Sequence, residues 1–315
     1  MKIAAAGFAA AVVVLLGFLL DGYHQGLAVY VAIYFIAILG LDIVTGYTGQ
    51  ISIGHGGFMA IGGYTTAMLS HYEHWNLLLT LPASLAVTFL VGVLVGIPAL
   101  RLSGVYLALV TFGFAVSIPQ LPLKFSKLLG GSNGLHTAHS VTHLWLYVVS
   151  WSCAGVALLL AWLLLRGRTG RAFRAVRDSE VAAASSGVAL PIYKTLAFGV
   201  SGALAGVAGS LLVLATNGFA QPSEFGVLLS LQILIGAAVA GLGSLWGVIL
   251  GALFVGLLPS VSASFPVIGS AHGQDVVFGL AVIVIMLVLP NGVAGLLRRF
   301  EPSFKTAIKR DPNTS

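Results

Sequence analysis

Long apolar runs, separated by short polar stretches, make up most of the chain. A helix needs about 17 to 25 apolar residues to cross the hydrocarbon core of a bilayer. Uninterrupted runs of this kind cover residues 3–20, 27–44, 77–100, 105–123, 147–165, 195–215 and 276–297. Two further apolar stretches, 52–69 and 227–265, are interrupted by glycine and polar residues, and the second is long enough to cross twice. The pattern predicts an all-α, polytopic helical bundle with about ten crossings, counting broken or re-entrant helices near 50–60 and 241–247.

The first interruption reads "GQISIGHGG" at residues 49–57, and the second reads "GLGSLWG" at residues 241–247. Unpaired backbone amides and carbonyls cost several kcal/mol in hydrocarbon, so a broken helix at this depth lines a polar passage or a helix interface. Two interrupted segments in roughly corresponding halves of a chain are typical of a transport site. We expect the translocation pathway to be lined or shaped by residues of the first interruption: Gln50, Ser52, Gly54, His55, Gly56 and Gly57.

Three ionisable residues lie within or beside the apolar segments, and two of them have alternative interpretations. His55 either hydrogen-bonds a neighbouring helix or takes part directly in the pathway. Asp42 lies near one end of an apolar run, where it either makes a cap or local hydrogen bond or relays protons. Glu224, in "QPSEFGV", is interpreted as a cap for a helix that begins near Phe225.

Composition excludes a water-soluble globule, because 58% of the 315 residues are hydrophobic and only 8% are charged. Among the 40 glycines, pairs four residues apart, such as Gly202 and Gly206, would let helix backbones approach closely in lipid. The single cysteine, Cys153, lies in an apolar run, has no disulfide partner and is expected to be inert.

Basic residues orient the bundle, since cytoplasmic loops retain Lys and Arg. With Lys2 inside and ten crossings, Arg101, residues 166–194 and the tail 298–310 all fall on the cytoplasmic side. Of the 15 basic residues, only Lys124 and Lys127 then fall outside. We therefore expect both termini to be cytoplasmic, a transmembrane domain over residues 1–297 and a cytoplasmic tail over 298–315.

The longest polar interruption is "RGRTGRAFRAVRDSEVAAASSGVALPIYK" at residues 166–194. It predicts a short amphipathic helix over residues 171–186. Gly187 suits the C-terminal stop of that helix, and Pro191 suits the first turn of the next one. One stripe of the helix would carry Phe173, Val176, Val181 and Ala184, and the opposite side Arg174, Asp178 and Ser185. The alternative is an ordinary basic loop that rests on anionic lipid headgroups.

Several motifs, taken in order, carry a family resemblance: "GYTGQISIGHGGFMAIGGYTTAML", "GIPALRLSGVYLALVTFGF", "GGSNGL", "GRAFRAVRDSEVAAASSGVALPIYKTLAFGVSGALAGVAGSLL", "GLGSLWGVILGALF" and "LPNGVAGLL". From residue 39 to 297 the chain resembles the inner-membrane permease subunit of branched-chain amino acid ABC importers. The resemblance implies a homologous second permease, two ATPase subunits and an extracytoplasmic binding protein as partners. It also implies that residues 166–194 are the ATPase-coupling segment, acting through Arg171, Arg174, Arg177, Asp178, Glu180 and Gly187.

The chain departs from the family pattern at two places. Permeases of ABC importers often carry Glu-Ala-Ala, three further residues and Gly in the coupling segment. Ala182, Ala183 and Gly187 fit this spacing, but Val181 holds the Glu position and Glu180 comes one residue early. Asp42 stands where the resemblance leads us to expect a neutral amide.

The resemblance implies a permease subunit that translocates branched-chain amino acids, with urea, amides or another small polar solute as alternative substrates. The chain contains no Gly-Lys dipeptide and so no phosphate-binding P-loop. We therefore expect that it binds no cofactor or metal and is not an enzyme, and that partner ATPases use the ATP. Membrane lipid is an expected partner, and nucleic acid is not.

Two other classes of protein compete with this interpretation. A membrane enzyme finds little support, because no His-Glu-x-x-His motif occurs. Two predicted external loops carry a possible zinc-binding pattern: His71, Glu73, His74, His136, His139 and His143. Without a recognisable carboxylate or thiol framework, they are interpreted as ordinary polar loop residues. A further alternative is that the histidines tune docking of a binding protein as pH falls. A secondary transporter working alone would suit Asp42 and His55 as ion-coupling residues, but it would not need a cytoplasmic coupling helix.

Overall fold

The computed structural model describes residues 20–139 and 141–263, together with the single positions 17, 279, 280, 283 and 287. The predicted span 3–20 lies outside the described residues except at positions 17 and 20. The predicted span 276–297 lies outside them except at positions 279, 280, 283 and 287. Lys2, His272 and the predicted tail 298–315 lie outside them as well.

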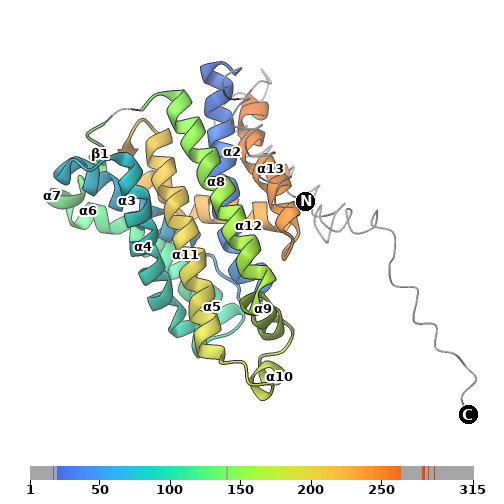
Figure 1. The fold of residues 1–315 in the computed structure, drawn as a ribbon. Helices are drawn as coiled ribbons and strands as arrows, with labels where there is room; N and C mark the ends of the chain where they lie inside the picture. The colour runs from blue at the N-terminus through green and yellow to red at the C-terminus, as the bar shows by residue number, and fades with distance from the viewer. Residues whose placement is uncertain are drawn as a thin grey trace, which may run out of the picture.

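The described residues form an all-α bundle, as the apolar runs predict (Figure 1). The long helices are α2 (Gly22–Leu41), α3 (His55–Glu73), α4 (Leu77–Gly96), α5 (Val105–Ser117), α8 (His143–Arg166), α11 (Leu190–Ala215), α12 (Val227–Ala240) and α13 (Leu245–Ala263). Shorter helices are α6 (Leu121–Lys124), α7 (Ser126–Leu129), α9 (Arg168–Asp178) and α10 (Glu180–Ser185). A π-helical turn, η1 (Asp42–Tyr47), extends α2, and 3₁₀ turns are η2 (Pro98–Leu100), η3 (Ile118–Gln120), η4 (Gly131–Asn133) and η5 (Pro222–Phe225).

Polar side chains define where several helices begin. The Asn76 side chain accepts a hydrogen bond from the Leu78 amide before α4, and Thr142 accepts one from the Trp145 amide before α8. At one end of the bundle, β1 (Leu135–His136) and β2 (Phe219–Ala220) form a short antiparallel pair. α9 and α10 lie at the opposite end (Figure 1).

Six helical stretches are long and apolar enough to cross a membrane within the described residues. They are Gly22–Tyr47, Leu77–Leu100, Val105–Lys124, His143–Arg166, Leu190–Ala215 and Pro222–Ala240. α3 is not among them, because glycine, threonine and histidine dilute its apolar side chains, and α13 qualifies only as a shorter apolar helix. The chain is therefore a multi-pass membrane protein, but the count of about ten crossings is not confirmed.

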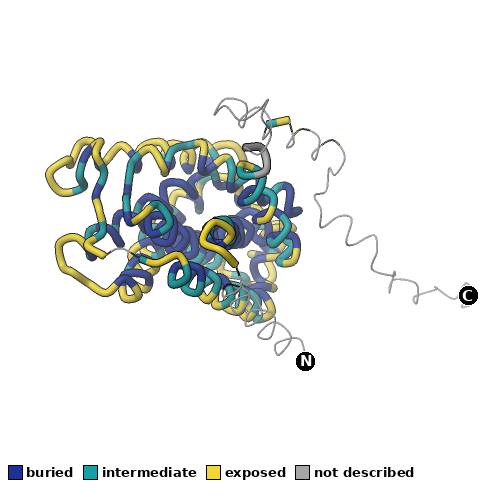
Figure 2. Tube along the Cα trace, turned by 90° about the horizontal axis from the view of Figure 1, so that it is seen from above, coloured by how far each residue is buried: buried dark blue, intermediate teal, exposed yellow. Residues whose placement is uncertain are grey.

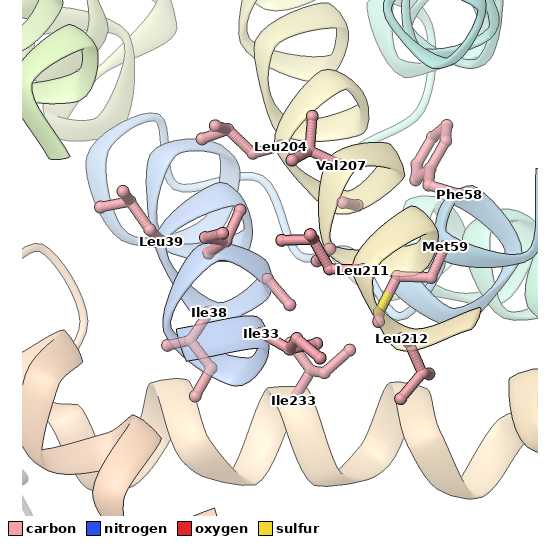
Figure 3. Packing of buried hydrophobic residues seen from close by; sticks show 14 of the residues in the cluster. Ile33, Ile38, Leu39, Phe58, Met59, Leu204, Val207, Leu211, Leu212 and Ile233 are labelled. Carbon is pink, nitrogen blue, oxygen red and sulfur yellow. The ribbon is translucent and has the colours of Figure 1, made fainter. Parts of the chain in front are cut away.

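α11 is the central helix of the bundle. Its apolar span is 89% buried, whereas the spans of α4 and α5 are 28% buried. In Figure 3, Leu211 of α11 lies between Ile33 of α2 and Met59 of α3. Seen from above, the buried parts of the chain gather in the middle of the bundle and the exposed parts at its rim (Figure 2). The outward-facing apolar side chains of the outer helices fit a lipid environment.

Glycines and serines bring α3 and α4 against α11. A Cβ atom on Gly62 of α3 would overlap the backbone of Gly206, and one on Gly209 would overlap the backbone of Met59. Between the helices, the Ser210 hydroxyl donates to the Gly62 carbonyl (3.1 Å) and the Ser84 hydroxyl donates to the Gly206 carbonyl (3.2 Å). Small residues and interhelical hydrogen bonds of this kind hold helices together in lipid, where apolar burial gives little net driving force.

Gly62→Val is predicted to destabilise the protein, because the neighbouring atoms belong to the Gly206 backbone and cannot rotate away. Overpacking of this kind costs roughly 1–3 kcal/mol or more. Gly26→Val in α2 is the matched control, since a Cβ there meets nothing within 4 Å. Thermal unfolding of the detergent-solubilised protein measures both, and equal unfolding temperatures for the two variants would contradict the packing described.

Candidate functional site

The first irregular segment, residues 48–54, links η1 to α3. A break near residues 50–60 is therefore confirmed, but it is shorter than expected, because His55, Gly56 and Gly57 already belong to the first turn of α3. The chain leaves η1 through Gly49, which adopts a left-handed backbone with φ of 71°.

Side chains from two other helices satisfy the backbone of this break. The Ile53 amide donates to Thr111 Oγ1 of α5 (3.0 Å), and the Gly56 amide donates to Ser230 Oγ of α12 (2.8 Å). These amides belong to a helix N-terminus and its approach, where no intrahelical acceptor is available. The break thus anchors α3 to α5 and α12.

His55 is 1% exposed and lies next to Ser201 of α11, with 3.1 Å between Nε2 and the serine Oγ. Its Nδ1 has no hydrogen-bond partner in the described part of the chain. The hydrogen bond to a neighbouring helix that the sequence allowed is therefore present. A direct role of His55 in a passage stays a prediction.

The other expected pathway residues are also enclosed by the chain itself. Gln50, Ser52, Gly54, Gly56 and Gly57 are all buried, whereas Gly49 and Ile51 are exposed. Neither side-chain atom of the Gln50 amide has a hydrogen-bond partner among the described residues, which is costly for a buried amide. The structure encloses these residues in the interior of the described bundle.

The second irregular segment, residues 241–244, connects α12 to α13. It is shorter than the predicted break at 241–247, because α13 already begins at Leu245. Gly241 and Gly243 have φ of 84° and 81°, a left-handed region that strongly favours glycine. Ser244 Oγ accepts a hydrogen bond from the Gly247 amide (3.3 Å) and so caps α13.

The second irregular segment meets η1 at Asp42, the first residue of η1. Asp42 is 2% exposed, and its Oδ1 accepts a hydrogen bond from the Gly243 amide (2.6 Å). A Cβ on Gly46, one π-helical turn along, would overlap both Asp42 Oδ1 and the Gly243 amide. The structure therefore shows Asp42 as the acceptor of a backbone hydrogen bond. The donor, Gly243, is its neighbour in space but lies 201 residues away in the sequence.

Residues 166–194 form two short helices, α9 and α10, instead of the single helix predicted over 171–186. Ser179 separates them with an extended backbone, and its side chain caps α10 by accepting from the Ala182 amide. Phe173 and Val176 are buried as predicted. The break turns Val181 outward to 78% exposure and exposes Ala184, so that Ala183 becomes the buried residue of α10.

Gly187 ends α10 with a left-handed backbone, as predicted, and its φ is 81°. The Gly187 amide donates to the Ala184 carbonyl (3.0 Å), and the Val188 amide donates to the Ala183 carbonyl (3.0 Å). Pro191 lies in the first turn of α11, also as predicted.

Two charged contacts join α9 and α10 to neighbouring elements, one to η1 and one to α11. Arg177 Nη1 donates to the Gly46 carbonyl of η1 (2.6 Å). Glu180 Oε1 lies 2.6 Å from Nζ of Lys194, whose side chain is 4% exposed and also reaches the Ala99 carbonyl. Arg177 is exposed overall despite this contact, as are the remaining expected coupling residues Arg171, Arg174 and Asp178.

The alternative chemistry suggested by the histidines finds no support in the described residues, which contain no group of three His, Cys, Asp or Glu side chains able to hold a metal ion. Residues 130–134 have the Gly-x-Ser-x-Gly spacing of hydrolases. However, Ser132 is exposed in the turn η4, not at a strand-to-helix elbow. Glu224 is not a cap, because α12 begins at Val227 and Gly226 precedes it. Cys153 is a free, partly buried thiol.

Known proteins resemble the chain over most of its length. The family described as "Branched-chain amino acid transport system / permease component" matches residues 23–289. The chain is 32% identical to the high-affinity branched-chain amino acid transport system permease protein LivM of Salmonella typhimurium, covering 86% of this chain and 70% of that protein.

More distant relatives include the autoinducer 2 import system permease protein LsrC of Salmonella paratyphi B (26% identity; 66% of this chain, 62% of that protein). The high-affinity branched-chain amino acid transport system permease protein LivH of Escherichia coli is 30% identical over 47% of this chain and 46% of its own length. No solved structure matches the chain.

Glu180→Gln is predicted to lower the unfolding temperature, because it leaves the buried Lys194 ammonium without its charged partner. Breaking a fully buried ion pair costs about 3–5 kcal/mol. The loss here should be smaller, since 43% of the Glu180 side chain is exposed. Asp178→Asn, two residues earlier and exposed, is the control that should leave the unfolding temperature unchanged. Equal unfolding temperatures for wild type and Glu180→Gln would show that the pair contributes nothing.

Proposed function

The chain belongs to the permease components of branched-chain amino acid transport systems, and on this premise we propose that it is one membrane subunit of an ATP-driven ABC importer. In this importer a second, homologous permease completes the membrane part, and two ATPase subunits supply the energy. An extracytoplasmic binding protein delivers the substrate. The chain itself is a transport subunit that binds no nucleotide or metal.

The observation that carries the proposal is the segment 166–194. The short helices α9 and α10 of this segment lie at one end of the bundle (Figure 1). Val181 of α10 (78%) and Ile192 in the first turn of α11 (63%) expose apolar side chains there. Arg171 and Arg174 are exposed beside them. Exposed apolar residues rimmed by charge are typical of protein interfaces, and an ATPase surface would cover them. A carrier that works alone has no need of such a surface.

The distribution of charge supports the orientation. Arg101 follows η2, whose Ala99 carbonyl contacts Lys194, so Arg101 and residues 166–194 lie at the same end. Cytoplasmic loops are enriched in Lys and Arg, and we assign this end to the cytoplasm of a bacterial-type inner membrane. Adding α3, α13 and the predicted spans 3–20 and 276–297 to the six candidate spans gives about ten crossings and two cytoplasmic termini. α12 is counted as a broken span, because it runs across α2 and not alongside it (Figure 3).

Branched-chain amino acids are the proposed substrates. LivM and LivH, two of the relatives, are named for this transport, whereas LsrC is named for import of autoinducer 2. Substrate therefore varies among relatives of this chain, and urea, amides and other small polar solutes are the alternatives. We place the passage along the break at 48–54, with Gln50, Ser52, Gly54, His55, Gly56 and Gly57 shaping it. The unpaired amide of Gln50 supports this placement.

Reconstitution tests the proposed function. The chain is co-purified with its second permease and two ATPases, placed in proteoliposomes with ATP and supplied with the binding protein. Uptake of radiolabelled leucine is then compared with uptake of urea. ATP-dependent leucine uptake is expected. Uptake by the purified chain alone, without ATP, would establish a secondary transporter instead.

Gly187→Val is predicted to uncouple ATP hydrolysis from transport, because a β-branched residue resists the left-handed backbone that ends α10. The strain is about 1–2 kcal/mol. A Cβ at Gly187 meets nothing within 4 Å, so the effect comes from the backbone and not from a clash. Gly187→Asn is the matched control, since asparagine tolerates this conformation. The ratio of leucine imported to ATP hydrolysed should fall for valine and stay near wild type for asparagine, whereas equal ratios for both would contradict the prediction.

A further inference from the structure

We propose that Asp42, Gly46, Arg177 and Gly243 form a clamp that joins the 166–194 segment to both irregular segments of the bundle. Movement of α9 would then be passed directly to residues 48–54 and 241–244, without relay through the intervening helices. This inference rests on the proposed function, because it takes the ATPases to act on residues 166–194.

The geometry places the Arg177 guanidinium between the two irregular segments. Its Nη1 donates to the Gly46 carbonyl (2.6 Å), and a Cβ on Gly243 would lie only 2.7 Å from the same nitrogen. Nearer the backbone, Arg177 Cγ lies 3.2 Å from the position of a Cβ on Gly49. One side chain of α9 therefore packs against both glycine-containing breaks.

Asp42 closes the clamp from the other side. Its Oδ1 accepts from the Gly243 amide (2.6 Å), which ties η1 to the segment 241–244. Its second oxygen, Oδ2, is buried and has no hydrogen-bond partner among the described residues. Gly46 lies between this carboxylate and Arg177, because a Cβ on Gly46 would overlap Asp42 Oδ1 while the Gly46 carbonyl accepts from Arg177 Nη1.

The two glycines of the clamp have no room for a side chain. At Gly46, the position of a Cβ is taken by Asp42 Oδ1 and the Gly243 amide. At Gly243, it is taken by Arg177 Nη1 and the Gly46 carbonyl, and φ of 81° disfavours other residues as well. This close fit lets the three segments move together, because a packed contact of this kind transmits displacement with little slack.

The test uses the complete importer in proteoliposomes. Arg177→Gln removes the guanidinium that donates to the Gly46 carbonyl and packs against Gly243. The double variant Arg177→Gln with Asp42→Asn removes both charges and leaves an amide oxygen to accept from Gly243. Arg177→Lys keeps the charge but not the planar fork. Arg168→Gln is the control, because Arg168 is an exposed arginine at the start of the same helix and lies outside the clamp. Leucine uptake, ATP hydrolysis and co-elution of the subunits are measured for each.

Both the single glutamine variant and the double variant should assemble and hydrolyse ATP, while the leucine imported per ATP falls about fivefold or more, within the range of typical coupling energies. Arg177→Lys should recover part of the ratio, and Arg168→Gln should keep the wild-type ratio. A purely structural role would lower assembly and leave the ratio unchanged in the complexes that form. A wild-type ratio in the double variant, or failure of that variant to assemble, would overturn the clamp.

Failure of the proposed function looks different. In that case the wild-type chain would not bring ATPases through purification, or the wild-type complex would not import leucine with ATP. Coupled import by the wild type together with normal coupling in the clamp variants would leave the proposed function intact and remove only the clamp.

Discussion

Irregular backbone inside an apolar bundle must find hydrogen-bond partners within the protein, because lipid offers none. The bundle meets this constraint at residues 48–54 and 241–244. Thr111 and Ser230 accept from amides at the start of α3, and Asp42 accepts from Gly243. Each partner comes from a different helix or turn, so satisfying the breaks also fixes α5, α12 and η1 in place. Arg177 extends the same arrangement to α9 by donating to the Gly46 carbonyl.

Close packing around α11 supplies the rigid frame for these contacts. Glycine at the crossing of α3 and α11 lets backbones touch, and Ser84 and Ser210 add hydrogen bonds between the helices. Lys194, in the first turns of the same helix, carries the ion pair to Glu180. α11 therefore connects the centre of the bundle to α10, while Arg177 connects η1 and the second break to α9. α9 and α10 are thus joined to η1 and α11 by two separate charged contacts.

Local sequence signals predicted much of this architecture. The length of apolar runs gave the helices, and glycine with polar residues indicated both breaks. Gly187 and Pro191 indicated where α10 ends and α11 begins. The failures have physical reasons: periodicity over 171–186 did not reveal that Ser179 would cap a new helix, so Val181 was placed on the wrong side. The partners of Asp42 and Arg177 lie 201 and 131 residues away, and no local spacing encodes them. Hydropathy does not identify α3 as a membrane span, because its glycine, threonine and histidine residues lower the mean hydropathy.

The central claim is that residues 166–194 seat on an ATPase, and a cross-link from Val181 tests it most directly. Cys153, the single cysteine, is replaced by serine, and Val181→Cys carries a short photoactivatable cross-linker in membranes that contain the co-expressed partners. Val156→Cys on α8, also an exposed apolar position at 56%, is the control on the outer surface of the bundle. Mass spectrometry should identify an ATPase peptide joined to position 181 and none joined to position 156. An assembled complex with no ATPase adduct at position 181 would contradict the account.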